Sequence, residues 1–154
     1  MLKKNIFFSL ILVIFLIAIF FLINNNSSKN TEVGQIQSVK IAGKILKVEL
    51  ALTQKEQEQG LSGRDNLKED EGMLFVFSHI DKYSFWMKDM KFPLDIIWLS
   101  EDFHVIYIKE NATPESYPES FSPSLYSKYV LEVNALFSLK NNLKVGDEVH
   151  FSSP

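Results

Sequence analysis

A long apolar segment near the N-terminus sets the strongest limit on how this chain folds. Ile6 to Ile23 spans 18 residues, and Ser9 is the polar residue within it. As a helix rising about 1.5 Å per residue, the segment is roughly 27 Å long, close to the roughly 30 Å of a bilayer's hydrocarbon layer. It shows neither the polar stripe nor the caps of a buried helix in a soluble protein. The segment therefore predicts a single transmembrane helix.

The flanks of this segment predict its orientation. Lys3 and Lys4 lie immediately before it, whereas residues 24–28 after it are asparagine and serine. By the positive-inside rule, residues 1–5 lie in the cytoplasm and the chain beyond residue 23 lies outside. The alternative is a cleaved signal peptide, which would make the protein secreted. Such peptides usually have an apolar region of about 7–15 residues and an Ala-x-Ala-like cleavage site, which is not visible here. We therefore expect a retained single-pass anchor, a polar linker over 24–32 and an extracytoplasmic domain over 33–154.

Composition excludes several functions for the rest of the chain. Without Lys3 and Lys4 it carries 14 basic and 19 acidic residues, a balance of −5 that argues against nucleic acid as a partner. Cysteine is absent, so disulfides, thiolate catalysis, Cys-ligated metals and a lipidated cysteine are excluded. His79, His104 and His150 lack the spacing of a metal site. We expect no cofactor and no bound metal.

The pattern of the domain favours strands. Apolar and charged residues alternate over 44–50, as in a half-buried strand. Thr53 and Glu56 have capping-box spacing for a short helix that Gly60 ends. Further strands are expected over 73–77, 84–87, 94–99 and 103–108, which together predict an antiparallel meander. A proline-containing loop follows over 111–123. Two more strands are expected over 129–133 and 148–151, with a short helix over 134–141 between them. With no repeat and no βαβ alternation, we expect an all-β sandwich or compressed barrel, mostly antiparallel, with one or two short helices and a phenylalanine-rich core.

A set of short motifs follows in a specific order over roughly residues 45 to 151. They are Leu50-Ala51-Leu52-Thr53, Glu56-Gln57, Gly60-Leu61 with Arg64, Gly72 to Phe77, Phe85-Trp86-Met87-Lys88, Leu94-Asp95-Ile96, Val130 to Val133 and Val145 to Val149. This order resembles the DUF192 family, also called UPF0127, small domains of unassigned function. The resemblance implies a β-sandwich or barrel-like fold but no substrate or activity.

The sequence departs from the family pattern in three places. Ser62 stands where the family usually has Met after Gly-Leu, and Asp89-Met90 stands where Asn-Thr usually follows Trp-Met. Asn134-Ala135-Leu136 stands where the family usually has a Gly. We therefore expect the turn or helix start after Glu132 to differ locally from the family.

Arg64 is the candidate for a specialised charge. It is the only arginine beside fifteen lysines, and a guanidinium can hold a carboxylate through two parallel hydrogen bonds. Asp95 and Glu132 each lie among apolar residues of expected strands, where an unpaired acid is costly. A buried ion pair that sets strand register is the favoured interpretation, and a ligand-binding or acid/base site formed by the three residues is the alternative.

The segment from Phe85 to Lys88 is a second candidate, because an aromatic platform beside a cation suits a sugar or a peptide. Strand alternation directs Phe85 and Met87 to one face and Trp86 and Lys88 to the other. At least half of the segment is therefore expected to be core. Ordinary packing is the favoured interpretation.

These features favour a non-enzymatic, membrane-tethered module that binds a protein or glycan of the cell envelope, where the tether raises its effective concentration. The alternative is an envelope hydrolase in which Asp95 and Glu132 act as a carboxyl pair about 5–9 Å apart, oriented by Arg64. A third hypothesis is a structural domain of a larger membrane complex, which predicts an exposed apolar patch.

Overall fold

The computed structural model describes residues 33–153. The predicted transmembrane helix over 6–23, its cytoplasmic flank and the linker over 24–32 lie outside these residues. Within 33–153, no helix combines the length and the apolar character that crossing a membrane requires.

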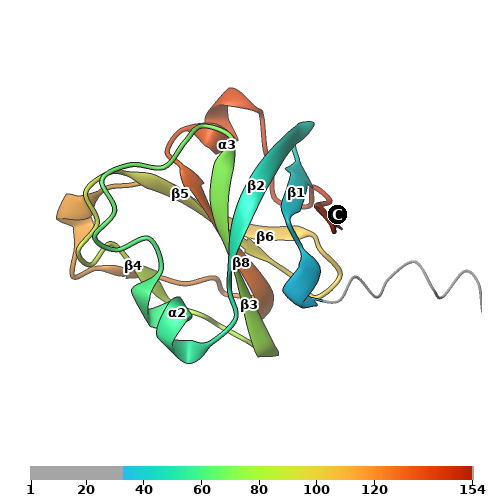
Figure 1. Cartoon of the computed structure of the whole chain (residues 1–154), viewed down its shortest axis with the longest axis horizontal. Helices are drawn as coiled ribbons and strands as arrows, with labels where there is room; N and C mark the ends of the chain where they lie inside the picture. The colour runs from blue at the N-terminus through green and yellow to red at the C-terminus, as the bar shows by residue number, and fades with distance from the viewer. Residues whose placement is uncertain (1–32, 154) are drawn as a thin grey trace, which may run out of the picture. The chain divides into compact units, whose positions relative to one another are not determined.

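Strands dominate the described part of the chain, which also contains two short α-helices (Figure 1). The strands are β1 (Ser38–Ile41), β2 (Lys44–Ala51), β3 (Glu71–Asp81), β4 (Phe85–Trp86), β5 (Leu94–Leu99), β6 (Val105–Ala112), β7 (Ser120–Phe121), β8 (Ser127–Asn134) and β9 (His150–Ser152). The α-helices are α2 (Gln54–Gln59) and α3 (Phe137–Lys140), and short 3-10 turns cover Val33–Gln35 and Pro114–Ser116. The predicted mostly β class with one or two short helices is confirmed.

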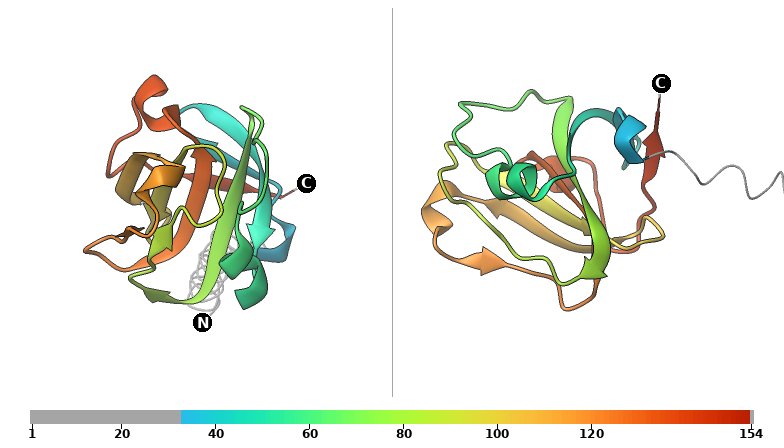
Figure 2. Two further views of the ribbon diagram at one scale, coloured as in Figure 1. Left: turned by 90° about the vertical axis from the view of Figure 1, so that its left-hand side faces the viewer. Right: turned by 60° about the horizontal axis from the view of Figure 1, so that its bottom comes forward.

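Seven strands form one sheet in the order β6-β5-β8-β3-β2-β1-β9, and β4 pairs with β7 in a separate two-stranded sheet. The sheet curls (Figure 2). At its two edges an isolated bridge joins His104 to Glu148, and the backbone N–H of Val149 donates to the carbonyl of Phe103 at 2.9 Å. Most pairs are antiparallel, as predicted, but β2 and β3 run parallel.

The predicted meander is wrong. β5 and β6 form a hairpin, but β8 lies between β3 and β5 and pairs with both. β4 leaves this sheet altogether to pair with β7. The strands of 73–99 are close in sequence, yet a strand from near the end of the chain lies among them. β8 is buried along most of its length on both faces, as is usual for a strand in the interior of a sheet.

Two apolar layers cover the two faces of the sheet. The face enclosed by the curl carries buried side chains from β1, β2, β3, β5, β6 and β8. The outer face of β3, β5 and β8 carries a second layer, which includes Phe75, Ile96 and Val130 and is covered by Leu61 and Met87 from the segments around it. The loop between α2 and β3 and the segment between β3 and β5 therefore fold over the outside of the central strands.

The predicted capping box begins α2. Thr53 accepts the N–H of Glu56 at 3.3 Å, and the Glu56 carboxylate accepts the N–H of Thr53 at 2.9 Å. Gly60 follows with φ +49° and ψ −135°, a backbone conformation that glycine adopts easily. The capping box fixes where α2 begins, and Gly60 ends the helix and turns the chain toward β3.

A strained residue begins α3. Leu136 has φ +67°, in the left-handed region that favours glycine. It lies in the segment where the sequence departs from the family pattern. Glycine would take this conformation without strain.

Candidate functional site

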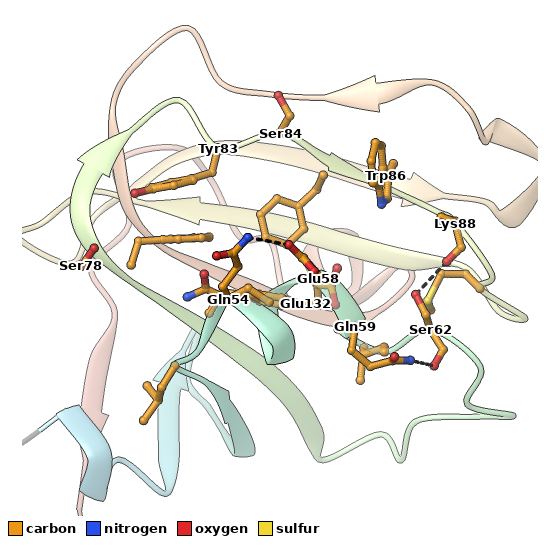
Figure 3. A pocket seen from close by; sticks show the side chains of 18 of the residues that line it. Gln54, Glu58, Gln59, Ser62, Ser78, Tyr83, Ser84, Trp86, Lys88 and Glu132 are labelled. Carbon is orange, nitrogen blue, oxygen red and sulfur yellow. Dashed lines mark hydrogen bonds between the residues drawn. The ribbon is translucent and has the colours of Figure 1, made fainter.

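A cavity of about 790 Å³ opens on the outer face of the central strands. Its walls come from three stretches of the chain: α2 with the loop that follows it, the second half of β3, and the segment 83–90 around β4. In Figure 3, Gln54, Glu58 and Gln59 of α2 line one wall, and Tyr83, Ser84 and Trp86 line another. Glu132 reaches the same cavity from β8.

Glu132 is the deeply buried polar group of the cavity. Its side chain is only 5% exposed, and Oε2 has no hydrogen-bond partner among residues 33–153. Register places it directly opposite Met73 of β3 and Ile96 of β5, so apolar side chains flank it on both sides. A β-carbon added at Gly60 would lie 3.8 Å from Oε2, which shows how closely the end of α2 approaches the carboxyl.

Burial controls the ionisation of this carboxyl. Desolvation raises the pKa of Glu132 from 4.5 to about 8, although the positive charge of Arg64 opposes the shift. Glu132 is therefore largely protonated at neutral pH when the cavity holds no cation. It can donate a hydrogen bond as an acid or accept one as a carboxylate, depending on what enters.

Arg64 holds a different carboxylate from those predicted. Nη1 and Nη2 donate to the two carboxylate oxygens of Glu49, both at 2.6 Å. The bidentate geometry expected for the lone arginine is present, but Glu49 is exposed on β2 and the pair is solvent-accessible. The predicted ion pair with Asp95 or Glu132 is therefore wrong: Arg64 acts on Glu132 only through its charge.

Asp95 is fully buried, and its carboxylate accepts hydrogen bonds from backbone N–H groups. Its Oδ1 accepts the N–H groups of Asn111 and Leu136 at 2.9 and 3.1 Å, and its Oδ2 accepts that of Ser138 at 2.8 Å. These bonds tie β5 to the end of β6 and to the start of α3. The carboxylate thus compensates its burial with backbone donors, and its role is structural.

The hydrolase hypothesis required Asp95 and Glu132 in one cleft. Asp95 lies opposite Val133, whereas Glu132 lies opposite Ile96, so the two carboxyls project from opposite faces of the sheet. Asp95 is not among the residues that line the cavity. The two acids cannot act on one bond.

The aromatic segment divides as strand alternation predicts. Met87 is buried and Phe85 half-buried, whereas Trp86 is 55% exposed and Lys88 is exposed. Both Trp86 and Lys88 line the cavity together with Glu132. The structure therefore brings three of the five predicted site residues to one cavity and leaves Arg64 and Asp95 outside it.

Aromatic rings form much of the cavity wall. Phe77 and Tyr83 stack with ring centroids 3.4 Å apart and planes inclined by 10°. Phe85 meets Phe75 edge-on at 4.8 Å. Phe77 and Tyr83 were not predicted as site residues: Phe77 lies within β3 and Tyr83 in the loop between β3 and β4, and neither belongs to a recognisable site motif.

Most polar side chains in the α2 wall of the cavity already form hydrogen bonds with other groups of the protein. The side-chain amide of Gln57 donates to the carbonyls of Ala51 and Val76, at 3.2 and 3.0 Å. That of Gln54 donates to Glu58 at 2.8 Å. The Ser62 hydroxyl donates to the carbonyl of Lys88, also at 2.8 Å, which joins the two walls (Figure 3).

The lining of this cavity has the composition of a ligand-binding site. The lining has two carboxyls: Glu132 is buried, whereas Glu58 is exposed on α2 and accepts the side-chain amide of Gln54. Within the described residues, no group of three His, Asp or Glu side chains is placed to hold a metal ion. An apolar cavity with few uncommitted polar groups is the usual form of a small-molecule site.

Comparisons with known proteins agree with this fold. The family model DUF192, described as "Uncharacterized ACR", matches residues 37–151. A crystal structure from Sinorhizobium meliloti 1021, described as a "putative transcription regulator", is 32% identical with a TM-score of 0.69, covering 74% of this chain and 90% of that one. A protein of unknown function from Novosphingobium aromaticivorans DSM 12444 is 34% identical with a TM-score of 0.70, covering 79% and 89%. No curated protein matches.

Proposed function

This chain belongs to the DUF192 family, and on that premise we propose that it is a membrane-tethered extracytoplasmic binding module whose ligand, a small component of the cell envelope, occupies the cavity over Glu132. The observation that carries the proposal is the unpartnered Oε2 of Glu132 at the base of a cavity of about 790 Å³. A buried polar atom without a partner costs free energy, so an occupant that supplies the missing hydrogen bond is stabilised there.

The tether is supported by the sequence alone. Ile6–Ile23 is long enough to span a bilayer, and Lys3 and Lys4 favour a cytoplasmic N-terminus. A domain held at the membrane surface meets envelope components at raised effective concentration, so modest affinity suffices. The balance of −5 beyond the N-terminal lysines disfavours nucleic acid as the ligand.

The location is tested by labelling introduced cysteines, because the chain has none of its own. Lys55→Cys lies on the exposed side of α2, and Lys4→Cys lies before the apolar segment. A membrane-impermeant maleimide should label Lys55→Cys in intact cells and Lys4→Cys only after permeabilisation. Labelling of both, or of neither, before permeabilisation would contradict the proposed orientation.

The ligand site is tested by closing the cavity. Ser62→Trp places an indole in the lining, and Ser124→Trp adds the same side chain at an exposed position outside it. Full-length variants in nanodiscs are incubated with the small-molecule fraction of the envelope, and bound ligand is read by native mass spectrometry. We expect Ser124→Trp to retain the wild-type adduct. In Ser62→Trp the affinity for the ligand should fall at least about tenfold, which corresponds to about 1.4 kcal/mol of binding free energy. Glu132→Leu provides a second variant if Ser62→Trp fails to fold. An adduct unchanged in a folded cavity variant would refute the site.

A further inference from the structure

We infer that the ligand of this cavity carries a cationic nitrogen, a primary ammonium or a guanidinium on an apolar stem, which pairs with the carboxylate of Glu132. The inference rests on the proposed function and names the ligand class. It follows from three properties of the cavity: the group that lacks a partner, the charges of its lining and the nature of its walls.

In its ionised form, the buried carboxyl of Glu132 needs a hydrogen-bond donor. An ionised carboxylate only accepts hydrogen bonds, and Oε2 of Glu132 accepts none within the described chain. A charged N–H donor forms a stronger bond than a neutral one and also compensates the buried negative charge. A cation therefore gains more from this position than an alcohol or an amide does.

No protein cation takes that place in residues 33–153. Both terminal nitrogens of Arg64 are held by Glu49 at 2.6 Å, so its guanidinium is committed on the outside of β2. The lining of the cavity contains two carboxyls, Glu58 and Glu132, against one ammonium, Lys88. The balance of charge favours a cation over an anion.

The walls suit a cation on an apolar stem better than a sugar. Five aromatic side chains line the cavity, and ring faces attract cations while their surfaces cover apolar atoms. A carbohydrate also needs many free hydrogen-bonding groups. The amides of Gln54 and Gln57 and the hydroxyl of Ser62 already donate to the protein.

The protonation of Glu132 gives the inference a distinctive signature. Its pKa is raised to about 8 by burial, so at pH 7 a cation that binds the carboxylate releases about 0.9 of a proton from this group. The affinity for the cation should therefore increase about tenfold for each unit by which the pH rises toward 8, and it should level off above pH 8. Other ionisable groups around the cavity are Glu58, His79, Tyr83 and Lys88 in its lining, and Arg64 with Glu49 and Glu71 beside it.

The test compares two probes of nearly the same shape, benzylamine and benzyl alcohol, on the full-length chain in nanodiscs. Isothermal titration calorimetry between pH 6 and pH 9, in buffers of different ionisation enthalpy, measures affinity and proton release together. We expect benzylamine to bind at least about tenfold more tightly than benzyl alcohol at pH 8, with release of about 0.5 of a proton at pH 8 and about 0.9 at pH 7. Free N-acetyl-lysine methylamide distinguishes a peptide lysine from a small free amine as the natural source.

Matched variants assign the effect to Glu132. Glu132→Gln should remove the preference for benzylamine and the pH dependence together, whereas Glu119→Gln, an exposed change outside the cavity, should preserve both. His79→Asn should keep the pH dependence. N-acetylglucosamine serves as a neutral sugar probe. The inference of a cationic ligand would be refuted if the two benzyl probes bound equally, or if benzyl alcohol or N-acetylglucosamine bound more tightly than benzylamine. It would also be refuted if Glu132→Gln kept the full response to benzylamine. If a neutral molecule binds in a manner that Ser62→Trp blocks, the cavity remains the ligand site and only the ligand class is refuted.

Discussion

Replacing Glu132 with glutamine tests the central physical claim, that the fold holds this carboxyl at a cost to its own stability. In the unfolded chain the carboxyl has its ordinary pKa of 4.5, and burial raises the pKa to about 8 in the folded state. Between these values the folded protein binds more protons at this group than the unfolded chain does. Stability therefore falls as pH rises from about 4.5, and the loss is complete above about pH 8.

The size of the effect follows from the shift. A shift of about 3.5 units at about 1.36 kcal/mol per unit corresponds to about 5 kcal/mol for full ionisation, of which about 4 kcal/mol is lost between pH 5 and pH 9. Glutamine cannot ionise, so Glu132→Gln should lack this slope. At about 4 °C per kcal/mol for a domain of this size, the Tm of the wild type should fall by about 15 °C more than that of Glu132→Gln over that range.

Thermal unfolding of the full-length chain in a non-ionic detergent, followed by near-ultraviolet circular dichroism, measures this difference. The signal is suitable because Trp98 is wholly buried in the outer apolar layer. Glu119→Gln should follow the wild type at every pH, since Glu119 is exposed. Parallel Tm curves for wild type and Glu132→Gln would refute the claim that Glu132 is destabilised by burial.

Three further changes probe the structural contacts by Tm in the same assay. Asp95→Asn should cost about 3–5 kcal/mol, because it weakens three charge-assisted bonds to buried or partly buried backbone N–H groups, and a loss below about 1 kcal/mol would contradict that role. Arg64→Lys should cost less than about 1 kcal/mol, since the pair with Glu49 is solvent-exposed, and a larger loss would show that the pair is more than a surface contact. Leu136→Gly should raise stability by up to about 1 kcal/mol by relieving the left-handed backbone, and destabilisation would show that the leucine side chain contributes more than its strain costs.

Local patterns were sufficient to predict most elements. The alternation over 44–50 corresponds to β2, and the spacing of Thr53 and Glu56 corresponds to the capping box of α2. Both depend on side chains a few residues apart, which meet whatever the rest of the chain does. The same locality explains why Trp86 and Lys88 were correctly separated from Phe85 and Met87.

Pairing between distant segments could not be predicted in the same way. Nothing near β3 in sequence indicates that β8 pairs with it, so the meander was the simpler expectation. The register of β8 against β5 places Asp95 and Glu132 on opposite faces, although each looked alike as an acid in an apolar strand. The partner of Arg64 was missed because Glu49 lies on the polar face of β2, where an acid needs no partner.

By itself, the sequence determined the class of the fold, the family, the approximate positions of most elements and the expectation of an N-terminal anchor, because each depends on residue type and short spacing. It also marked Glu132 as an acid that needs compensation. Only the tertiary structure decided that backbone N–H groups donate hydrogen bonds to Asp95 and not to Oε2 of Glu132. The reason is that the pairing register of β5 and β8 sets which face of the sheet each carboxyl occupies, and therefore which groups it meets. The cavity exists for the same reason: α2, β3, β8 and the segment around β4 meet only in the folded chain, and they leave one buried carboxyl facing open space.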